Sequence, residues 1–162
     1  MLSYTSEILI NKPVTTCFAE IVNLDSMKHW QEGLISFAHI SGTPRKIGST
    51  IQLNYQFGKR KMELTESVTH RKDNHSIHFN FDTKMMHNVQ QNFFEIIDDD
   101  TTKWISHNQF LPRNFTSRIM LVLMPKAFKK QSKKYLINFK NYVENGTSII
   151  KNNETIKTNL GF

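Results

Sequence analysis

Histidine has the widest chemical range of the residue types in this chain, because its imidazole can bind a metal or transfer a proton near neutral pH. The seven histidines are His29, His39, His70, His75, His78, His87 and His107. His75 and His78 are three positions apart on a predicted strand, which places them on opposite faces. The sequence has no His-x3-His pair and no second cysteine to complete a zinc site. We therefore predict no metal site.

Carboxylates and two of the histidines are the candidate acid–base groups. Glu63 and Glu66 are three apart on one predicted strand, so they cannot form a catalytic pair on one face. His87 and His107 lie on neighbouring predicted strands and could act as general bases if they face a cavity. Glu95 could act as an acid from inside a pocket, although we favour a solvent-facing position. No catalytic residue is assigned.

Motifs for cofactor and nucleophile chemistry are missing from the sequence. It contains no Gly-x-Gly-x-x-Gly, no phosphate-binding loop and no Gly-x-Ser-x-Gly elbow. Cys17 lies on an apolar helical stripe, which favours a core position. The run 98–100 is typical of a hairpin turn and lacks calcium-loop spacing. We predict no cofactor.

Length and composition indicate one globular domain. The chain has 162 residues, 38% of them hydrophobic, and a mean hydropathy of −0.46. No apolar run is long enough to span a membrane, and residues 1–7 do not resemble a secretion signal. We therefore expect a cytoplasmic protein. The formal charge of +7 has its excess in the C-terminal half.

Seven strands and two short helices are predicted to form the body of the domain. A strand over Ser3–Ile10 leads into a helix that begins at Pro13 and buries Val14, Cys17, Phe18 and Ile21. Asp25 is expected to cap a second short helix that runs through Trp30. Six further strands separated by turn residues predict consecutive antiparallel hairpins: Leu34–Ser41, Ser49–Phe57, Lys61–His70, Ser76–Phe81, His87–Ile97 and Lys103–Leu111.

A long helix is predicted over Phe115–Val143, interrupted or bent near Pro125. Its apolar side chains, from Leu121 to Val143, share one face, and its lysines lie on the opposite face. The domain is expected to cover residues 1–144. Residues 145–162 are predicted to form a polar, flexible tail.

This order of elements resembles the helix-grip fold of the SRPBCC superfamily, which includes START lipid-transfer domains and polyketide cyclase/dehydrase-like proteins. The segment from Ile10 to Phe18 is similar to its strand-to-helix entry, and Leu24–Gly33 to its second helix. Gly42–Ser49 and Leu123–Glu144 are similar to the turn before its third strand and to its closing helix. The resemblance implies an α+β fold in which a curved seven-stranded antiparallel sheet wraps around the long C-terminal helix.

The resemblance also implies a cavity for a lipid, sterol or polyketide-like molecule between sheet and helix. Strand and helix faces together with family position select the predicted ligand-binding residues: Trp30, Tyr55, Phe57, Phe79, Phe81, Phe94, His107, Phe110, Met120, Met124 and Phe128. Each of these side chains could instead only pack in the core.

Three functions follow from the resemblance. The first is binding or carriage of a hydrophobic small molecule. The second is a cyclase/dehydrase-type enzyme that uses His107, His87, Tyr55 or Glu95. The third is an interaction module of the chaperone-activator kind, without a cavity.

The lysine-rich helix face could be a solvated surface or could contact an anionic membrane transiently. We predict no nucleic-acid partner, because these lysines do not interleave with exposed aromatic residues. The sequence leaves the oligomeric state open.

Overall fold

The computed structural model describes residues 1–150 and contains one seven-stranded antiparallel sheet. Its strands are β1 Leu2–Ile10, β2 Leu34–Ser41, β3 Thr50–Phe57, β4 Arg60–Lys72, β5 Ser76–Asp82, β6 Met86–Asp98 and β7 Thr101–Pro112. The order across the sheet is β1-β7-β6-β5-β4-β3-β2. Consecutive strands from β2 to β7 are therefore hairpin neighbours, and β1 completes the sheet beside β7. The predicted α+β helix-grip architecture is confirmed.

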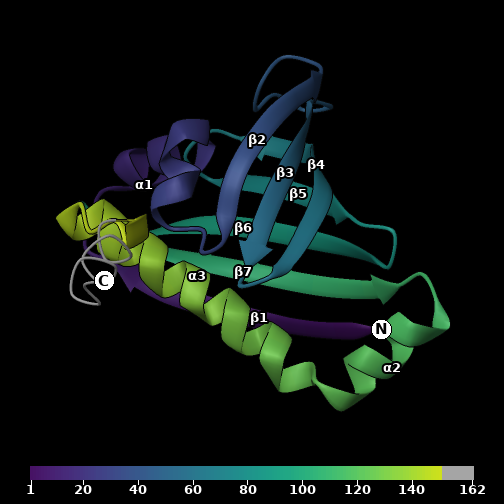
Figure 1. Cartoon of the computed structure of the whole chain (residues 1–162). Coiled ribbons are helices and arrows are strands. Elements are labelled where there is room, and N and C mark those ends of the chain that lie inside the picture. Colours follow the sequence, from purple (N-terminus) through teal and green to yellow (C-terminus); the bar gives the residue numbers. More distant parts are fainter. Residues whose placement is uncertain (151–162) are drawn as a thin grey trace, which may run out of the picture.

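Four helical segments accompany the sheet. They are α1 Val14–Val22, the 3₁₀ helix η1 Leu24–His29, α2 Phe115–Leu123 and α3 Pro125–Asn145. The sheet curves around α3, which runs across its concave side next to β1 (Figure 1). The helices α1 and η1 lie at one end of α3, and α2 lies at the other end (Figure 1). Helices therefore enclose the concave side of the sheet, with α3 across it, α1 and η1 at one end and α2 at the other.

The two short helices follow their predicted positions with one difference. Cys17, Phe18 and Ile21 are buried, as the helical spacing predicts. The cap of η1 is Asn23, whose side chain accepts a hydrogen bond from the backbone N–H of Asp25 at 3.0 Å. The prediction that Asp25 is the cap was therefore wrong by two positions.

The long C-terminal helix is broken into two at Met124, one residue before Pro125. Met124 has φ −127° and ψ 41°, which are not helical values, and Pro125 begins α3 at a position where its missing N–H is not needed. The predicted interruption is confirmed.

The residues that follow α3 are partly packed. Gly146 ends the helix in the left-handed conformation at φ 66°, which glycine adopts without steric cost. Ser148 is buried, and its hydroxyl lies 2.8 Å from Nδ1 of His29. Packing therefore continues past residue 144, the predicted end of the domain, because Ser148 docks against η1. The rest of the predicted flexible tail, residues 151–162, lies outside the described residues.

The two edges of the sheet differ in how they are covered. Edge strand β1 lies under α3, and Lys140 Nζ donates to the carbonyl of Leu9 at 2.6 Å. Edge strand β2 is solvent-exposed along nearly its whole length, and its pairing with β3 shifts register twice, between Leu34 and Ser36 and between His39 and Ser41. Such shifts are β-bulges, which bend and twist the strand.

Candidate functional site

A cavity of about 1090 Å³ lies between the concave face of the sheet and α3. Alternation along each strand directs every second side chain toward the concave side. On β3 these are Leu53, Tyr55 and Phe57, and on β5 they are Phe79 and Phe81. The helix wall of the cavity consists of side chains from α2 and α3: Met120, Phe128, Gln131, Ser132, Tyr135 and Leu136.

The outer end of the cavity is formed by the start of β4 and by two connections. Its lining residues include Arg60 at the start of β4, Lys84 in the β5–β6 turn and Arg113 in the β7–α2 connection. Lys84 and Arg60 are exposed, and Arg113 forms an ion pair with Asp82. We call this end the mouth. It is charged and lies next to α2.

The inner end is built from aromatic residues on four elements. Trp104 on β7 contacts Phe139 on α3 edge to face at a centroid distance of 4.9 Å, and Phe139 contacts Trp30 at 5.1 Å. Phe94 on β6 stacks on Trp104 at 5.9 Å. These four side chains are at most 5% exposed. This aromatic cluster closes the cavity toward α1 and η1.

Eight of the eleven predicted ligand-binding residues line the cavity. They are Trp30, Tyr55, Phe57, Phe79, Phe81, Phe110, Met120 and Phe128. Binding of a ligand to them stays a prediction.

The structure places the other three elsewhere. Phe94 is buried in the core between Phe18 and Trp104. Met124 is 54% exposed, because it is the non-helical residue between α2 and α3. His107 lies on the convex face, where its Nδ1 is 2.6 Å from the hydroxyl of Thr5. It cannot share a face with Phe110, three residues later on β7.

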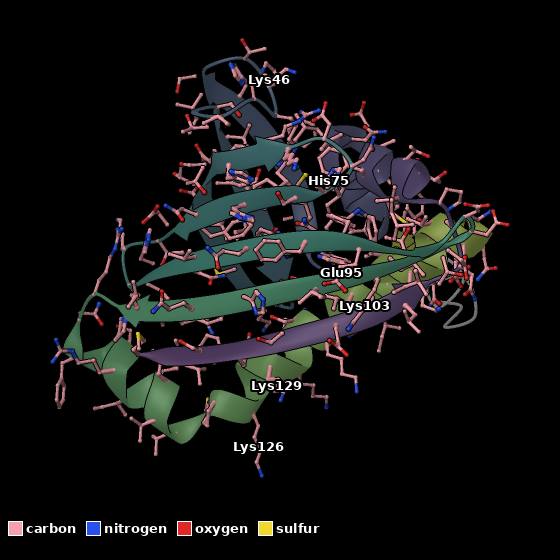
Figure 2. All side chains as sticks on the ribbon, turned by 180° about the vertical axis from the view of Figure 1, so that it is seen from behind. Lys46, His75, Glu95, Lys103, Lys126 and Lys129 are labelled. Carbon is pink, nitrogen blue, oxygen red and sulfur yellow. The ribbon has the colours of Figure 1, made fainter. Side chains whose placement is uncertain are left out.

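The other candidate acid–base groups also lie outside the cavity lining. His87 contacts Asp82, and its Nδ1 lies 2.7 Å from Oδ1 of that residue. Glu95 is exposed on the outer face of the sheet, turned away from α3 (Figure 2). Among the four groups of the cyclase/dehydrase hypothesis, Tyr55 alone lines the described cavity.

A buried ion pair, not predicted from the sequence, forms part of the cavity lining. The guanidinium of Arg45 contacts Glu66 Oε1, and the two residues are 6% and 3% exposed. The guanidinium also lies 5.2 Å from the ring centroid of Phe79 and donates to Met27 Sδ at 2.7 Å. Burial raises the pKa of Glu66 above its ordinary value, and Arg45 opposes that rise.

Tyr55 is held as a neutral phenol at the inner side of the cavity. Its hydroxyl donates to Gln31 Oε1 at 2.5 Å, and burial raises its pKa well above the ordinary value. Tyr135 on α3 has its pKa raised to about 12, also mainly by burial. Neither phenol is therefore suited to act as a base at neutral pH.

Alternation along β4 could have identified Glu66 in the sequence. Met62, Leu64 and Val68 are the apolar inward positions, and Glu66 has the same parity. No comparable signal exists for Arg45, which lies in the β2–β3 connection at a φ of 60°. Its burial depends on the tertiary position of Glu66.

Residues 1–150 carry neither a metal-binding cluster nor a membrane-spanning helix. No group of three or more His, Cys, Asp or Glu side chains in this range could hold a metal ion. No helix in this part of the chain has the length and apolarity needed to cross a bilayer.

Comparison with known proteins identifies similar structures but no sequence relative. No protein-family model matches the chain, and no curated protein matches it in sequence. The structure is similar to Ara h 8.0201, with a TM-score of 0.68 and 11% identity over 87% of this chain and 96% of that one. TTHA0849 from Thermus thermophilus has a TM-score of 0.72 and 11% identity over 90% and 99%.

A third similar structure is the di-domain ARO/CYC BexL from the BE-7585A biosynthetic pathway. Its TM-score is 0.72 at 13% identity, and the match covers 89% of this chain and 47% of that one. At these identities the similarity establishes the fold. It agrees with the SRPBCC resemblance found in the sequence.

Proposed function

We propose, from the helix-grip fold and the cavity that it encloses, that this protein binds and carries a hydrophobic small molecule of the lipid, sterol or polyketide class. The observation that carries the proposal is a cavity of about 1090 Å³ whose wall includes Phe57, Phe79, Phe81, Phe110 and Phe128. Concave sites of several hundred Å³ with mostly apolar walls are typical of small-molecule binding.

Burial alone supplies enough free energy for such a function. Removing about 300 Å² of apolar ligand surface from water contributes roughly 7 kcal/mol before ordering costs, at about 25 cal/mol per Å². The protein therefore needs no covalent chemistry to retain a ligand.

The two alternative functions have less support. A cyclase/dehydrase needs a polar group that can take or give a proton at the substrate, and His107, His87 and Glu95 do not line the cavity. An interaction module with a filled core would have no cavity of this size.

Native mass spectrometry of the protein purified from cells tests the proposal directly. We expect a co-purified apolar molecule that is released on denaturation. A clean apo mass, together with no thermal stabilisation by a panel of lipids, sterols and aromatic polyketides, would contradict ligand carriage.

A cavity-blocking variant makes the test specific. Leu64 is a cavity-lining residue on β4, so Leu64→Trp directs an indole into the space that a ligand would occupy. We expect at least a tenfold loss of affinity for the co-purified molecule, measured by titration of delipidated protein. The matched control is Ile35→Trp, because Ile35 is 60% exposed on β2 and is not a lining residue. Equal affinity in the two variants would place binding outside the cavity.

A further inference from the structure

The inner part of the cavity carries a neutral polar stripe within its apolar wall. On β6 the inward side chains include Asn88, Gln90 and Asn92, and on β7 they include Ser106 and Asn108. Register pairs Gln90 with Asn108 and Asn92 with Ser106. We call these five residues the amide stripe. A ligand made only of hydrocarbon would offer the amide stripe no hydrogen bonds, and buried polar groups without partners are unfavourable.

Hydrogen bonds inside the stripe converge on two oxygens. Asn92 Oδ1 accepts from Trp104 Nε1 at 3.0 Å and from Gln90 Nε2 at 3.1 Å. Ser106 Oγ is 3.2 Å from Gln90 Nε2 and 3.1 Å from Asn108 Nδ2, which both donate to it. These two acceptors are therefore used within the protein. Asn88 Oδ1, at the end of the stripe nearer the mouth, has no partner among the described residues.

The cavity-lining donors without a partner among the described residues are Asn92 Nδ2, Trp30 Nε1, Arg45 Nε and Gln131 Nε2. Two of these donors, Asn92 Nδ2 and Trp30 Nε1, lie at the inner end, on residues that are 0% and 5% exposed. An indole N–H can only donate, so the role of Trp30 is fixed. The orientation of the Asn92 amide is also fixed, because the indole N–H of Trp104 requires the amide oxygen as its acceptor. Both groups flank Trp104, which contacts the Trp30 ring at 6.4 Å.

We infer that the ligand carries a neutral oxygen acceptor, a carbonyl or a hydroxyl, on the part buried at the inner end of the cavity. This inference rests on the proposed ligand-binding function and narrows its ligand class. A carboxylate or phosphate would not suit this end, because the buried charges beside it, Arg45 and Glu66, already neutralise each other. Of the other charged lining residues, Lys84 and Arg113 lie on the connections at the mouth.

A matched pair of small probes tests the inference. Acetylnaphthalene and isopropenylnaphthalene, substituted at the same ring position, have nearly the same shape and differ in C=O against C=CH₂. Water solvates the ketone better, so burial alone favours the hydrocarbon. We expect the protein to bind the ketone about tenfold more tightly, because the ketone accepts from donors that are otherwise unpaired. Titration calorimetry measures both affinities.

Variants of Trp30 and Asn92 test whether these two donors cause the preference for the ketone. Trp30→Phe keeps an aromatic ring and removes the N–H, and Asn92→Leu removes the amide, so each is expected to reduce the ketone preference several-fold. Asn92→Leu also leaves the Trp104 N–H unpaired, so Trp30→Phe serves as the test if Asn92→Leu does not fold. The control is Gln91→Leu, which removes an exposed amide on the convex side of β6 and should keep the preference. Infrared spectra of the bound ketone should show a lowered carbonyl frequency that returns toward the free value in Trp30→Phe.

The outcomes separate this inference from the proposed function. Equal affinity for the two probes would overturn the acceptor inference, because it would mean that water satisfies the two donors. The proposal that the cavity binds a ligand would still stand. Binding of neither probe, with no co-purified molecule, would count against the proposed function itself.

A second inference comes from an independent observation at α2. Its outer side exposes large apolar groups: Phe115 is 76% exposed, Val122 78% and Leu123 74%, and Met124 and Ile119 are also exposed. We call these five residues the α2 patch. The opposite side of α2 packs inward through Ser117 and Leu121. One face of α2 is therefore covered by the protein and the other has no covering within residues 1–150.

The surroundings of the α2 patch are positively charged. Arg118 lies on α2 itself, and Lys126, Lys129 and Lys130 begin α3. Figure 2 shows Lys126 and Lys129 projecting from the start of α3 away from the sheet. The sequence contains no Asp or Glu from Thr101 to Val143.

We propose that the α2 patch docks on an anionic lipid bilayer. An apolar face bordered by cations fits the interfacial binding mode, in which apolar side chains enter the bilayer and lysines meet acidic headgroups. A second copy of the chain is a poor occupant, because it would bring the same cations together. The patch adjoins the mouth, since Met120 on α2 and Arg113 before it line the cavity. A docked protein would therefore hold its cavity mouth beside the membrane.

Vesicle co-sedimentation tests the docking surface. We expect the protein to bind vesicles that contain phosphatidylglycerol, to bind phosphatidylcholine vesicles weakly, and to lose binding as salt is raised. The double variant Val122→Ser/Leu123→Ser should bind anionic vesicles at least tenfold less well. The control is Ile40→Ser/Ile47→Ser, which removes two exposed apolar groups at 54% and 63% exposure from β2 and the loop after it. Equal loss in both double variants would overturn the assignment to α2, and so would dimerisation in solution that the α2 variant abolishes.

Discussion

Replacing Arg45 with methionine is expected to lower the free energy of unfolding by about 3–5 kcal/mol at neutral pH, because it leaves the Glu66 carboxylate buried without its partner. Arg45 and Glu66 are 6% and 3% exposed, so water cannot replace the lost contact. Urea unfolding followed by tryptophan fluorescence measures the change. The double variant Arg45→Met/Glu66→Leu removes both charges and should recover most of the loss. Equal destabilisation in the single and double variants would show that the cost arises from packing and not from the unpaired charge.

The loss of stability caused by Arg45→Met should depend on pH in a defined direction. Burial holds the pKa of Glu66 above its ordinary value in the folded protein, and Arg45 is the group that opposes this rise. Between the unfolded-state and folded-state pKa values the folded protein binds more protons, so stability falls as pH rises through the folded-state pKa. Arg45→Met raises that pKa further. Its deficit should therefore shrink on acidification through this window, and a deficit independent of pH would contradict the assignment.

Phe139→Ala is expected to cost about 3–5 kcal/mol of stability, because it removes the ring that joins the two tryptophans of the aromatic cluster. Phe139 is fully buried, with ring centroids 4.9 Å from Trp104 and 5.1 Å from Trp30. The empty volume would lie at the inner end of the cavity, where α3 and the curved sheet are held apart by other side chains and cannot close over it.

Ile137→Ala is the control for Phe139→Ala, because Ile137 lies on the same helix and is 41% exposed. Its effect should stay within about 0.5 kcal/mol. Denaturant unfolding of both variants, with the slope checked for constancy, measures the difference. A loss below about 1 kcal/mol in Phe139→Ala would show that the cluster relaxes around the gap.

Element order could be predicted from the sequence because each element carries its own local signal. Alternation marked the inward faces of β3 and β5, and Pro125 marked the break between α2 and α3. Strand ends were predicted less well. β4 extends over Arg60–Lys72, beyond the predicted Lys61–His70, because hairpin pairing with β3 and β5 continues past the alternating apolar residues.

The candidate site could be predicted where one face of an element is apolar and the other polar. On β7 the pattern is ambiguous, since Trp104 and Phe110 point inward while Ile105 and Leu111 point outward. Pairing with β6 and β1 decides the faces there, and it places His107 outside. The amide stripe was not predicted for a related reason. Asn92 and Ser106 are of residue types that are usually exposed, and they are buried only because the sheet curves.

The two register shifts in β2 bear on how copies of this protein meet at high concentration. An open sheet edge presents unpaired N–H and C=O groups on which another strand can add, and this is a common start of aggregation. In this sheet β1 lies beneath α3, so β2 is the accessible edge in the described chain. The bulges near Leu34 and His39 interrupt the regular spacing of its backbone groups at both ends. A strand from a second copy would match only the short stretch between them, which opposes growth of a continuous intermolecular sheet despite the exposed Ile35 and Phe37.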